Sequence, residues 1–423
     1  MKISAIAKKY GLSKDALYFY ISKGLLVPRM NGKQYIADET FERDLQLILK
    51  YRDWGFSLNE ILSILSAVRK NSSNEDQIVS TFISEMLLKK ADSIRDQISG
   101  LRETLVGILA ENERVLTAEA KGRSDAKGSI GVPLSMVSLL RCPNCGGSFS
   151  FSKSEMSQTQ IMNAELSCSC GYTAKIKDGI MITPNRNQSD YDHADVSREI
   201  YNDIPDILVS LYQKSYYWME KRLDTILKPG SVVMETHLND YFFLQYELEL
   251  LEKKKCRLIL VDKFPEILSM YKAVIERQER DIDVLFIADA GTNLPLRDDV
   301  VDAFIDFFGS NEHHFFSESS LLNRMSDYMT PTSYVVGTYF SIPERRESIK
   351  NMRQLYPESS PANFNLSLFR QETEKAGYKE VASEFIGETT ETGNNYWCFG
   401  FVDKDEKVRL DSFLLKRNET IAQ

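Results

Sequence analysis

The feature that most constrains the fold is an apolar seven-residue repeat between residues 87 and 115. This repeat predicts one long helix with a narrow apolar seam. Such a seam favours pairing with a second helix, although packing against the helix's own domain is the alternative. We therefore expect residues 76–118 to form a coiled-coil dimerisation helix. The seam positions alternate at spacings of four and three over four heptads: Leu87, Ala91, Ile94, Ile98, Leu101, Leu105, Ile108, Asn112 and Val115.

Length and composition predict a cytoplasmic protein of several folded units. The chain has 423 residues, of which 43% are hydrophobic and 27% charged, which is too apolar for wholesale disorder. No uncharged run approaches the ~20 residues of a membrane-spanning helix, and the charged N-terminus does not resemble a secretory signal. We therefore expect no contact with a membrane. Six cysteines are too few for a disulfide scaffold, so they are expected to be free thiols or metal ligands.

The charge of the chain is unevenly distributed. Residues 1–70 contain 12 Lys and Arg against 7 Asp and Glu, a net charge of +5, whereas the whole chain carries −9. Residues 71–423 therefore carry −14. A basic head on an acidic body is typical of a small nucleic-acid-binding domain joined to a part that does not bind nucleic acid.

The basic head itself predicts two short helices around a glycine turn. The first helix ends at Gly11, and Ser13 is a good N-cap for a second helix that begins at Lys14. This is the helix-turn-helix pattern, in which the second helix enters the major groove of DNA. A basic turn at residues 28–35 follows and is expected to form a wing against the phosphate backbone. A small helical packing module is the alternative.

The head resembles the MerR family of bacterial transcription regulators. The resemblance rests on Ile3–Leu26, on the Asn31-Gly32 turn and on the run Trp54–Ile61. It implies a winged helix-turn-helix domain over residues 1–75. It also implies an antiparallel coiled coil that holds two heads of a homodimer on palindromic promoter DNA and affects RNA polymerase indirectly.

The head departs from that family at two places that bear on the operator. Tyr18 stands where the family usually has Arg, and Lys33-Gln34 replace the usual Tyr-Arg of the wing. These differences change the expected operator more than DNA binding itself. The residues expected to contact DNA are Lys14, Asp15, Tyr18, Tyr20, Arg29, Lys33, Gln34 and Tyr35.

Small polar residues predict a linker at residues 119–136, and cysteines in two close pairs predict a metal site after it. Four thiolates at such spacing match the tetrahedral preference of Zn²⁺. Redox use is the alternative, but no βαβ pattern surrounds the first pair. Residues 137–185 resemble the short zinc ribbon that precedes some class I methyltransferases, so the metal is expected to be structural. The expected ligands are Cys142, Cys145, Cys168 and Cys170.

Strand-like and helix-like segments alternate after about residue 190. Strands are expected at 231–235, 257–261, 284–288, 303–308, 334–340, 380–385 and 396–402, and helices at 241–254, 265–279 and 317–328. This alternation predicts a doubly wound α/β sheet, with ligands at the carboxyl edge of its strands. The fold class is therefore multidomain, α plus α/β, with an α/β domain at 190–405 and a tail at 406–423.

The α/β domain resembles the class I S-adenosylmethionine-dependent methyltransferases, whose sheet is Rossmann-like. The resemblance rests on the runs Leu258–Pro265 and Ala288–Asp298. It implies that Asp262 takes the ribose hydroxyls and that Asp289 takes the adenine amine of S-adenosylmethionine or a related ligand. Solvated acids at strand ends are the alternative interpretation. The expected cofactor-binding residues are Glu235, His237, Asp262, Asp289 and Ala290.

The loop after the first strand departs from the methyltransferase pattern. A glycine-rich loop in that family lets the backbone pass close to the methionine portion of the cofactor. Residues 235–240 contain no glycine, so side chains such as His237 and Leu238 are expected to fill or rebuild that part of the pocket.

The remaining histidines and cysteines are given structural interpretations. His313 and His314 follow the fourth strand, where proton transfer or ligand binding is conceivable, but a polar surface loop is favoured. Cys256 and Cys398 lie in apolar segments and are expected in the core.

The sequence as a whole favours a MerR-like transcription regulator whose methyltransferase-like domain senses a small ligand. An active methyltransferase with a DNA-targeting head is the alternative from another class, and a dimerisation body with an empty fold is a third. The glycine-free loop favours a sensor over an enzyme, so no catalytic residue is expected.

Overall fold

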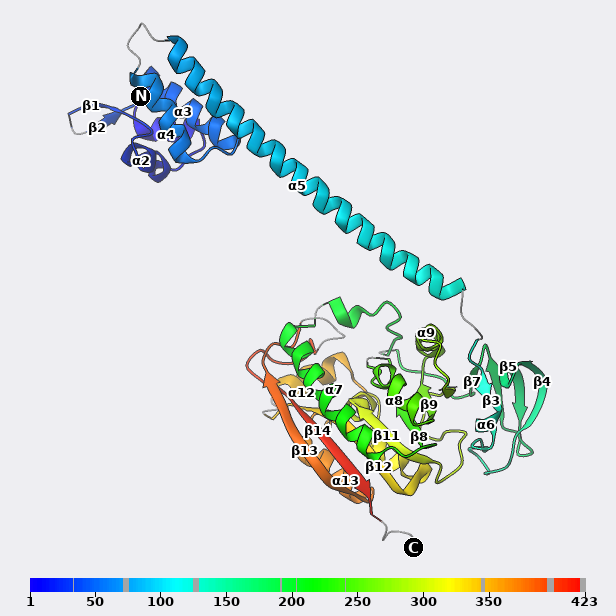
Figure 1. Cartoon of the computed structure of the whole chain (residues 1–423). Helices are drawn as coiled ribbons and strands as arrows, with labels where there is room; N and C mark the ends of the chain where they lie inside the picture. The colour runs from blue at the N-terminus through cyan, green and yellow to red at the C-terminus, as the bar shows by residue number, and fades with distance from the viewer. Residues whose placement is uncertain are drawn as a thin grey trace. The chain divides into compact units, whose positions relative to one another are not determined.

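The computed structural model describes residues 1–32, 34–70, 76–124, 129–190, 192–202, 204–239, 241–343, 347–393 and 399–418, without the side chains of 76–78, 110 and 112–124. The chain divides into two compact units, Met1–Glu119 and Ala120–Gln423 (Figure 1). None of the described helices combines the length and the apolarity that crossing a lipid bilayer requires.

The first unit is a helical head with a small hairpin. Its elements are α1 (Ile3–Lys9), α2 (Lys14–Ser22), β1 (Arg29–Asn31), β2 (Gln34–Ile36), α3 (Glu39–Asp53), α4 (Leu58–Lys70) and α5 (Asp76–Ser124). Side-chain caps fix the helix starts, because Ser13 Oγ accepts the Ala16 N–H at 3.1 Å and Asp38 Oδ1 accepts the Phe41 N–H at 2.9 Å. The winged helix-turn-helix expectation is confirmed for the described residues.

Helix α5 is a single helix of 49 residues, as the seven-residue repeat predicts. Seam residues Ile94, Ile98, Leu101, Leu105 and Ile108 are exposed in the single chain, with Leu101 at 69%. An apolar row this exposed is typical of a surface that a partner helix covers. Asn112 and Val115 lie outside the described side chains.

The second unit is built on one continuous sheet whose strands follow the order β13-β14-β12-β11-β8-β9-β10-β7-β6-β5-β3. Its central strands β8 to β12 are parallel where they pair, β14 lies antiparallel between β12 and β13, and β4 pairs with β5. The strands are β3 (Val132–Pro133), β4 (Ser150–Ser157), β5 (Gln160–Ser167), β6 (Thr173–Lys177), β7 (Ile180–Ile182), β8 (Val232–Thr236), β9 (Arg257–Asp262), β10 (Asp283–Ala288), β11 (Val301–Phe307), β12 (Met329–Ser341), β13 (Tyr378–Thr389) and β14 (Val408–Arg417).

Helices cover both faces of this sheet, so its central strands are apolar on both sides. In β9, Leu258 and Leu260 join one core cluster, and Ile259 and Val261 join the other. The first cluster also holds residues of α7 (Asp206–Ile226), α8 (Leu248–Lys253) and α9 (Pro265–Glu276). The second holds residues of α6 (Leu134–Val137), α11 (Leu321–Met325) and α13 (Leu366–Lys375). The doubly wound, Rossmann-like sheet is confirmed.

Several expected boundaries are wrong. The segment expected to be a linker contains the end of α5, and its Val132 and Met136 are buried in the second unit. Helices expected at 241–254 and 317–328 are short pieces, α8 with a 3₁₀ turn at Leu244–Tyr246 and α11 with another at Ser326–Tyr328.

The last strand is also misplaced by the sequence. Residues 399–402, expected in a strand, form a turn, while Val408–Arg417, expected in the tail, form β14. The charged residues of this segment made it look like an exposed tail in the sequence. Arg409 and Asp411 pair with each other at 2.6 Å, and this pairing lets both lie in a largely buried strand. Tyr396 and Cys398 lie outside the described residues.

We expect β14 to be essential to the second unit. Ending the chain at Asp405 removes the buried side chains of Leu410, Phe413, Leu414 and Leu415, each of which contributes about 1.5–3 kcal/mol. Their combined loss is comparable with the stability of a typical domain, about 5–15 kcal/mol. Calorimetry should then show no cooperative unfolding of the α/β unit. A control chain that ends at Asn418 should unfold as the full chain does. If the chain that ends at Asp405 gave the same unfolding transition as this control, the assignment would be contradicted.

Candidate DNA-binding, metal and ligand sites

The expected DNA-binding residues lie on two exposed surfaces of the head. Lys14, Asp15 and Tyr18 are exposed on α2. Arg29, Gln34 and Tyr35 are exposed on the β1–β2 hairpin, where Asn31 pairs with Gln34 across the turn. Lys33 lies outside the described residues.

The expectation for Tyr20 is wrong. Its side chain is 3% exposed, and Arg52 donates a hydrogen bond to its hydroxyl. Tyr20 follows Tyr18 by two positions on a helix and therefore points to a different side, into the core of the head. The exposed aromatic neighbour on this helix is Phe19, which the sequence analysis did not assign.

The four expected cysteines converge on one point. Their sulfur atoms all lie within 4.8 Å of one another, with Cys142 and Cys170 at 3.5 Å and Cys145 and Cys168 at 3.4 Å. Tetrahedral zinc with Zn–S bonds of ~2.3 Å separates its sulfurs by about 3.8 Å, so the four thiols fit such an ion. The cluster could hold a metal ion.

Tight backbone turns shape the cysteine cluster. The Gly146 N–H donates to the Cys142 carbonyl, and the Gly171 N–H donates to the Cys168 carbonyl, each at 2.9 Å. Both glycines have a positive φ, of 70° and 93°. The backbone N–H of Cys170 donates toward the Cys168 sulfur and is the main reason that its pKa is lowered to about 6. A thiolate is therefore favoured at Cys168, whereas burial raises the pKa of Cys142.

This ribbon is continuous with the α/β sheet. Strand β7 pairs in parallel with β10, in register Phe286 with Ile180, and Leu140 bridges Leu296. The cysteine cluster therefore lies on the same structural body as the expected ligand edge.

Asp262 and Asp289, expected to bind a nucleoside, line one polar cleft together with Ala290 and Gly291. The cleft encloses about 430 Å³, including space open to solvent. Asp262 accepts the N–H groups of Asn239 at 3.0 Å and Phe264 at 2.8 Å. Burial raises the pKa of Asp262 to about 6 and also raises the pKa of Asp289. The two acids are brought together, and the solvated-acid interpretation is wrong because both are buried.

Glu235 was expected to bind the cofactor, but it does not line this cleft. It is 1% exposed, and its two oxygens accept the N–H groups of Phe243 at 2.7 Å and Leu244 at 2.9 Å. Burial raises its pKa to about 8. Glu235 therefore holds the following loop in place rather than contacting a ligand.

His237 occupies the position where the sequence lacks the family's glycine. Its φ is 60°, a left-handed backbone conformation that glycine adopts at little cost. Its Nδ1 lies 2.9 Å from the Thr236 hydroxyl, and burial lowers its pKa, so the ring is neutral. The backbone thus keeps a glycine-like path while a side chain occupies the space beside it. Asp240 lies outside the described residues.

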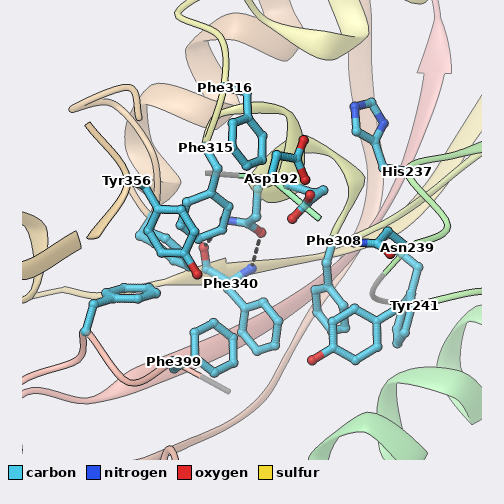
Figure 2. A pocket seen from close by; sticks show the side chains of 15 residues that line it. Asp192, His237, Asn239, Tyr241, Phe308, Phe315, Phe316, Phe340, Tyr356 and Phe399 are labelled. Atoms are coloured by element: carbon cyan, nitrogen blue, oxygen red, sulfur yellow. Dashed lines mark hydrogen bonds between the residues drawn. The ribbon is translucent and has the colours of Figure 1, made fainter. Parts of the chain in front are cut away.

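His237 also lines a second, larger cavity of about 670 Å³, including space open to solvent. Ten of its fifteen lining residues are aromatic, among them Tyr241, Phe308, Phe340 and Phe399 (Figure 2). The rings of Phe308 and Phe340 stack at 4.0 Å between centroids. This cavity and the polar cleft share the His237 side chain as a common wall.

A buried charge cluster adjoins the aromatic cavity. Lys263 pairs with Asp192 and, at 3.2 Å, with Glu312. Burial by itself would lower the pKa of Lys263, but Glu312 and Asp192 outweigh it and raise that pKa. Lys263 therefore stays charged and also lies 4.2 Å from the centre of the Phe316 ring.

The favoured surface interpretation of His313 and His314 is wrong. Both are buried, at 9% and 2% exposure, in and just after a short helix at Gly309–His313. His313 lines the polar cleft, and its ring meets that of His237 edge to face at 5.5 Å between centroids. Burial lowers the pKa of His313 to about 3, so it is a neutral wall of the cleft. Cys256 is a core residue as expected.

Sequence reasoning missed the aromatic cavity and its charge cluster. The doublets Phe307-Phe308 and Phe315-Phe316 offered a signal, because they place four aromatic rings at and soon after the carboxyl end of one strand. The remaining rings, at Tyr356 and Phe399, come from distant segments that no local pattern connects.

Solved structures of methyltransferases resemble about half of the chain, at low identity. A geranyl diphosphate methyltransferase in complex with geranyl diphosphate and sinefungin has a TM-score of 0.36 and 10% identity, covering 48% of this chain and 77% of that one. A sarcosine dimethylglycine methyltransferase from Galdieria sulphuraria, described as putative, has the same TM-score and identity over 49% of this chain and 86% of that one.

Sequence comparisons concern the first unit. Residues 1–68 match the model described as MerR HTH family regulatory protein, and residues 42–109 match MerR, DNA binding. The transcriptional regulator CueR of Salmonella typhimurium is 29% identical over 114 residues, which are 25% of this chain and 83% of that protein. An uncharacterized HTH-type transcriptional regulator of Synechocystis is 32% identical over 108 residues, 23% of this chain and 77% of that protein. On these matches, and with its helix-turn-helix head and long helix, the chain belongs to the MerR family of transcription regulators.

Proposed function

We propose that this regulator binds promoter DNA as a homodimer and that its α/β unit senses a small ligand. The observation that carries the sensory part is the aromatic cavity beside the polar cleft, with His237 between them. A cavity lined mainly by aromatic rings, with a few convergent polar groups, is typical of a small-molecule site.

The DNA-binding part is supported by the surface of the head. Lys14 and Tyr18 lie on the helix that enters the major groove in this fold, and Arg29 lies on the wing. Arg29 is 80% exposed at its side chain and pairs only with Asp38 among the described residues, at 2.7 Å. Contacts of Lys14 and Arg29 with phosphates would give affinity, and Tyr18 would contribute to base recognition.

The homodimer is supported by the exposed seam of α5. Leu101, Leu105 and Ile108 are each more than half exposed, and in a dimer they would face the seam of a second copy. The antiparallel direction of this pair follows from the MerR family. Two heads held in this way fit an operator with two-fold symmetry, through which RNA polymerase would be affected indirectly.

The ligand-sensing role is favoured over catalysis by the geometry of the first loop. Asp262 and Asp289 fit the nucleoside half of S-adenosylmethionine, because both line the cleft in which that half would lie. The amino-acid half fits poorly, because the His237 ring stands where close backbone approach would be needed. Methyl transfer demands accurate placement of the donor, whereas sensing requires only that a ligand bind two states of the dimer unequally.

The metal is proposed to be one structural Zn²⁺ per chain. Four sulfur ligands leave no open position for catalysis, and they tie the knuckle at Cys142 to the strand end at Cys168.

Replacing Lys14 with Ala should weaken binding to DNA fragments that the full-length protein selects from a genomic library. Loss of one phosphate contact lowers the slope of log affinity against log salt by about 0.9. Fluorescence anisotropy over a salt series measures this slope. The exposed Lys175, on β6 of the ribbon, gives a matched control, and Lys175→Ala should leave the slope unchanged.

The same protein also tests the dimer. Sedimentation equilibrium should give the mass of two chains, and Leu101→Lys should give one chain and weaken DNA binding. Glu103→Lys, on the same helix but off the seam, is the control.

For the DNA-binding test of Lys14, equal binding by the Lys14→Ala and unaltered proteins would remove α2 from the DNA interface.

Zinc should be present at one ion per chain in protein kept reduced. Cys145→Ser removes one sulfur ligand and should lower the zinc content well below one while the dimer persists. Elemental analysis measures the metal, and the core variant Cys256→Ala should retain it. Full zinc content in Cys145→Ser would exclude this cysteine as a ligand.

S-adenosylhomocysteine should bind more tightly to His237→Gly than to the unaltered protein, because glycine accepts the φ of 60° and removes the intruding ring. Titration calorimetry measures both affinities, and Asp262→Ala should weaken binding in either background. Labelled S-adenosylmethionine incubated with the protein and cell extract should give little transfer. Robust transfer that Asp262→Ala abolishes would make the protein an enzyme.

A further inference from the structure

We infer that the aromatic cavity takes the aromatic part of a planar, largely apolar organic cation. The inference deepens the proposed sensory role, on which it rests for its regulatory meaning but not for binding itself. Its basis is the juxtaposition of stacked aromatic walls with a buried cluster of two carboxylates and one ammonium.

The walls of the cavity favour a flat, apolar occupant. Phe308 and Phe340 are nearly parallel, at 18°, and Phe399 meets Phe340 edge to face at 4.6 Å between centroids. Phe315 packs on Tyr356 at 4.6 Å. Because these rings already pack on one another, they form a firm apolar wall, and a ligand ring that meets their edges or outer faces gains about 0.5–1.5 kcal/mol per ring pair beyond area burial.

The charge cluster determines the sign of the occupant. Lys263 compensates one of the two carboxylates, Asp192 and Glu312. Burial raises the pKa of Asp192 to about 7, so at pH 8 its carboxylate form prevails and the ionised cluster has a net charge of −1. Both carboxylate side chains are at most 10% exposed, so water screens them weakly. A ligand with a positive group would restore neutrality at this end of the cavity, whereas an anion would be repelled.

The aromatic lining already accommodates a cation. The Lys263 ammonium lies 4.2 Å from the centre of the Phe316 ring. Attraction between a cation and an aromatic face is worth about 0.5–2 kcal/mol, more where water is excluded. A cationic ligand would find the same kind of surface on the other rings of the cavity.

The other polar side chains that line the cavity among the described residues add no positive charge. The Asn311 amide donates to the carbonyls of Phe340 at 3.0 Å and Asn363 at 3.1 Å, and its oxygen accepts the Phe340 N–H. The Asn239 side chain is likewise held by the backbone of His193 and Asp195. The His237 ring is neutral and adds no positive charge.

The experiment compares three probes that share one ring system. 9-Aminoacridine is a cation at pH 8, acridine is neutral, and acridine-9-carboxylate is an anion. Each is titrated into the full-length protein without DNA, and binding is followed by probe fluorescence. We expect the cation to bind about tenfold more tightly than acridine and the anion to bind more weakly than either.

Variants assign the effect to the cavity. Glu312→Gln should cost the cation about tenfold and leave acridine nearly unchanged. Phe316→Leu should weaken the binding of both 9-aminoacridine and acridine. Glu318→Gln, an exposed acid outside the cavity, is the matched control and should change nothing. Thermal unfolding verifies that each variant is folded, and Asp192→Asn replaces Glu312→Gln if the latter is not.

Equal affinities for all three probes, or a cation affinity that neither carboxylate variant lowers, would overturn the inference. The proposed function fails separately. It fails if the cation binds as expected while no ligand, including molecules released from the purified protein, changes DNA affinity. It survives the loss of this inference if another released molecule changes DNA affinity while the cation does not bind.

Discussion

The ligand edge of the α/β unit depends on four buried carboxylates, one at the end of each of its parallel strands β8 to β11. Glu235 accepts the N–H groups of Phe243 and Leu244, and Asp262 accepts those of Asn239 and Phe264. Asp289 accepts the Gly291 N–H at 2.7 Å, and Asp306 accepts the Ser310 N–H at 2.7 Å. Each acid therefore fixes the loop that follows a strand, or the loop beside it, and these loops form the walls of both cavities.

This use of the carboxylates has an energetic consequence. Burial raises the pKa of Glu235 to about 8 and those of Asp262 and Asp306 to about 6, so the sheet edge holds acids that water would otherwise ionise readily. Hydrogen bonds from backbone N–H groups offset part of this cost. Removing such an acid would disturb a loop as well as a contact.

The sheet also connects the carboxyl edge of β8 to β11 with β3, the first strand of the second unit. Strand β3, which lies shortly after α5 in the sequence, pairs with β5, and the strands β5, β6, β7 and β10 are consecutive neighbours. The cysteine cluster lies on the loops of this part of the sheet. A ligand that alters the loops at β8 to β11 would thus act on one continuous sheet that includes β3.

The sequence by itself determined the features that arise from local patterns. The cap at Ser13, the heptads of α5, the close cysteine pairs and the apolar strands of the α/β sheet are each recognisable from a few neighbouring residues. It also located the polar cleft, because Asp262 and Asp289 end adjacent parallel strands and must meet at one edge. The absence of glycine after β8 indicated an altered pocket. In the structure His237 has a left-handed backbone there, and its side chain lines both cavities.

Only the tertiary structure decided which of these side chains face a ligand. Tyr20 and Glu235 were assigned to sites but are buried with backbone or side-chain partners, because their orientation depends on packing beyond their own helix or strand. Strand β14 was hidden by its charges, which the Arg409–Asp411 pair neutralises within the sheet. The aromatic cavity gathers rings and charges from segments more than a hundred residues apart, such as Asp192 and Phe399. A cavity of this kind has no sequence signature, since its lining is set by which distant segments the sheet and its helices bring together.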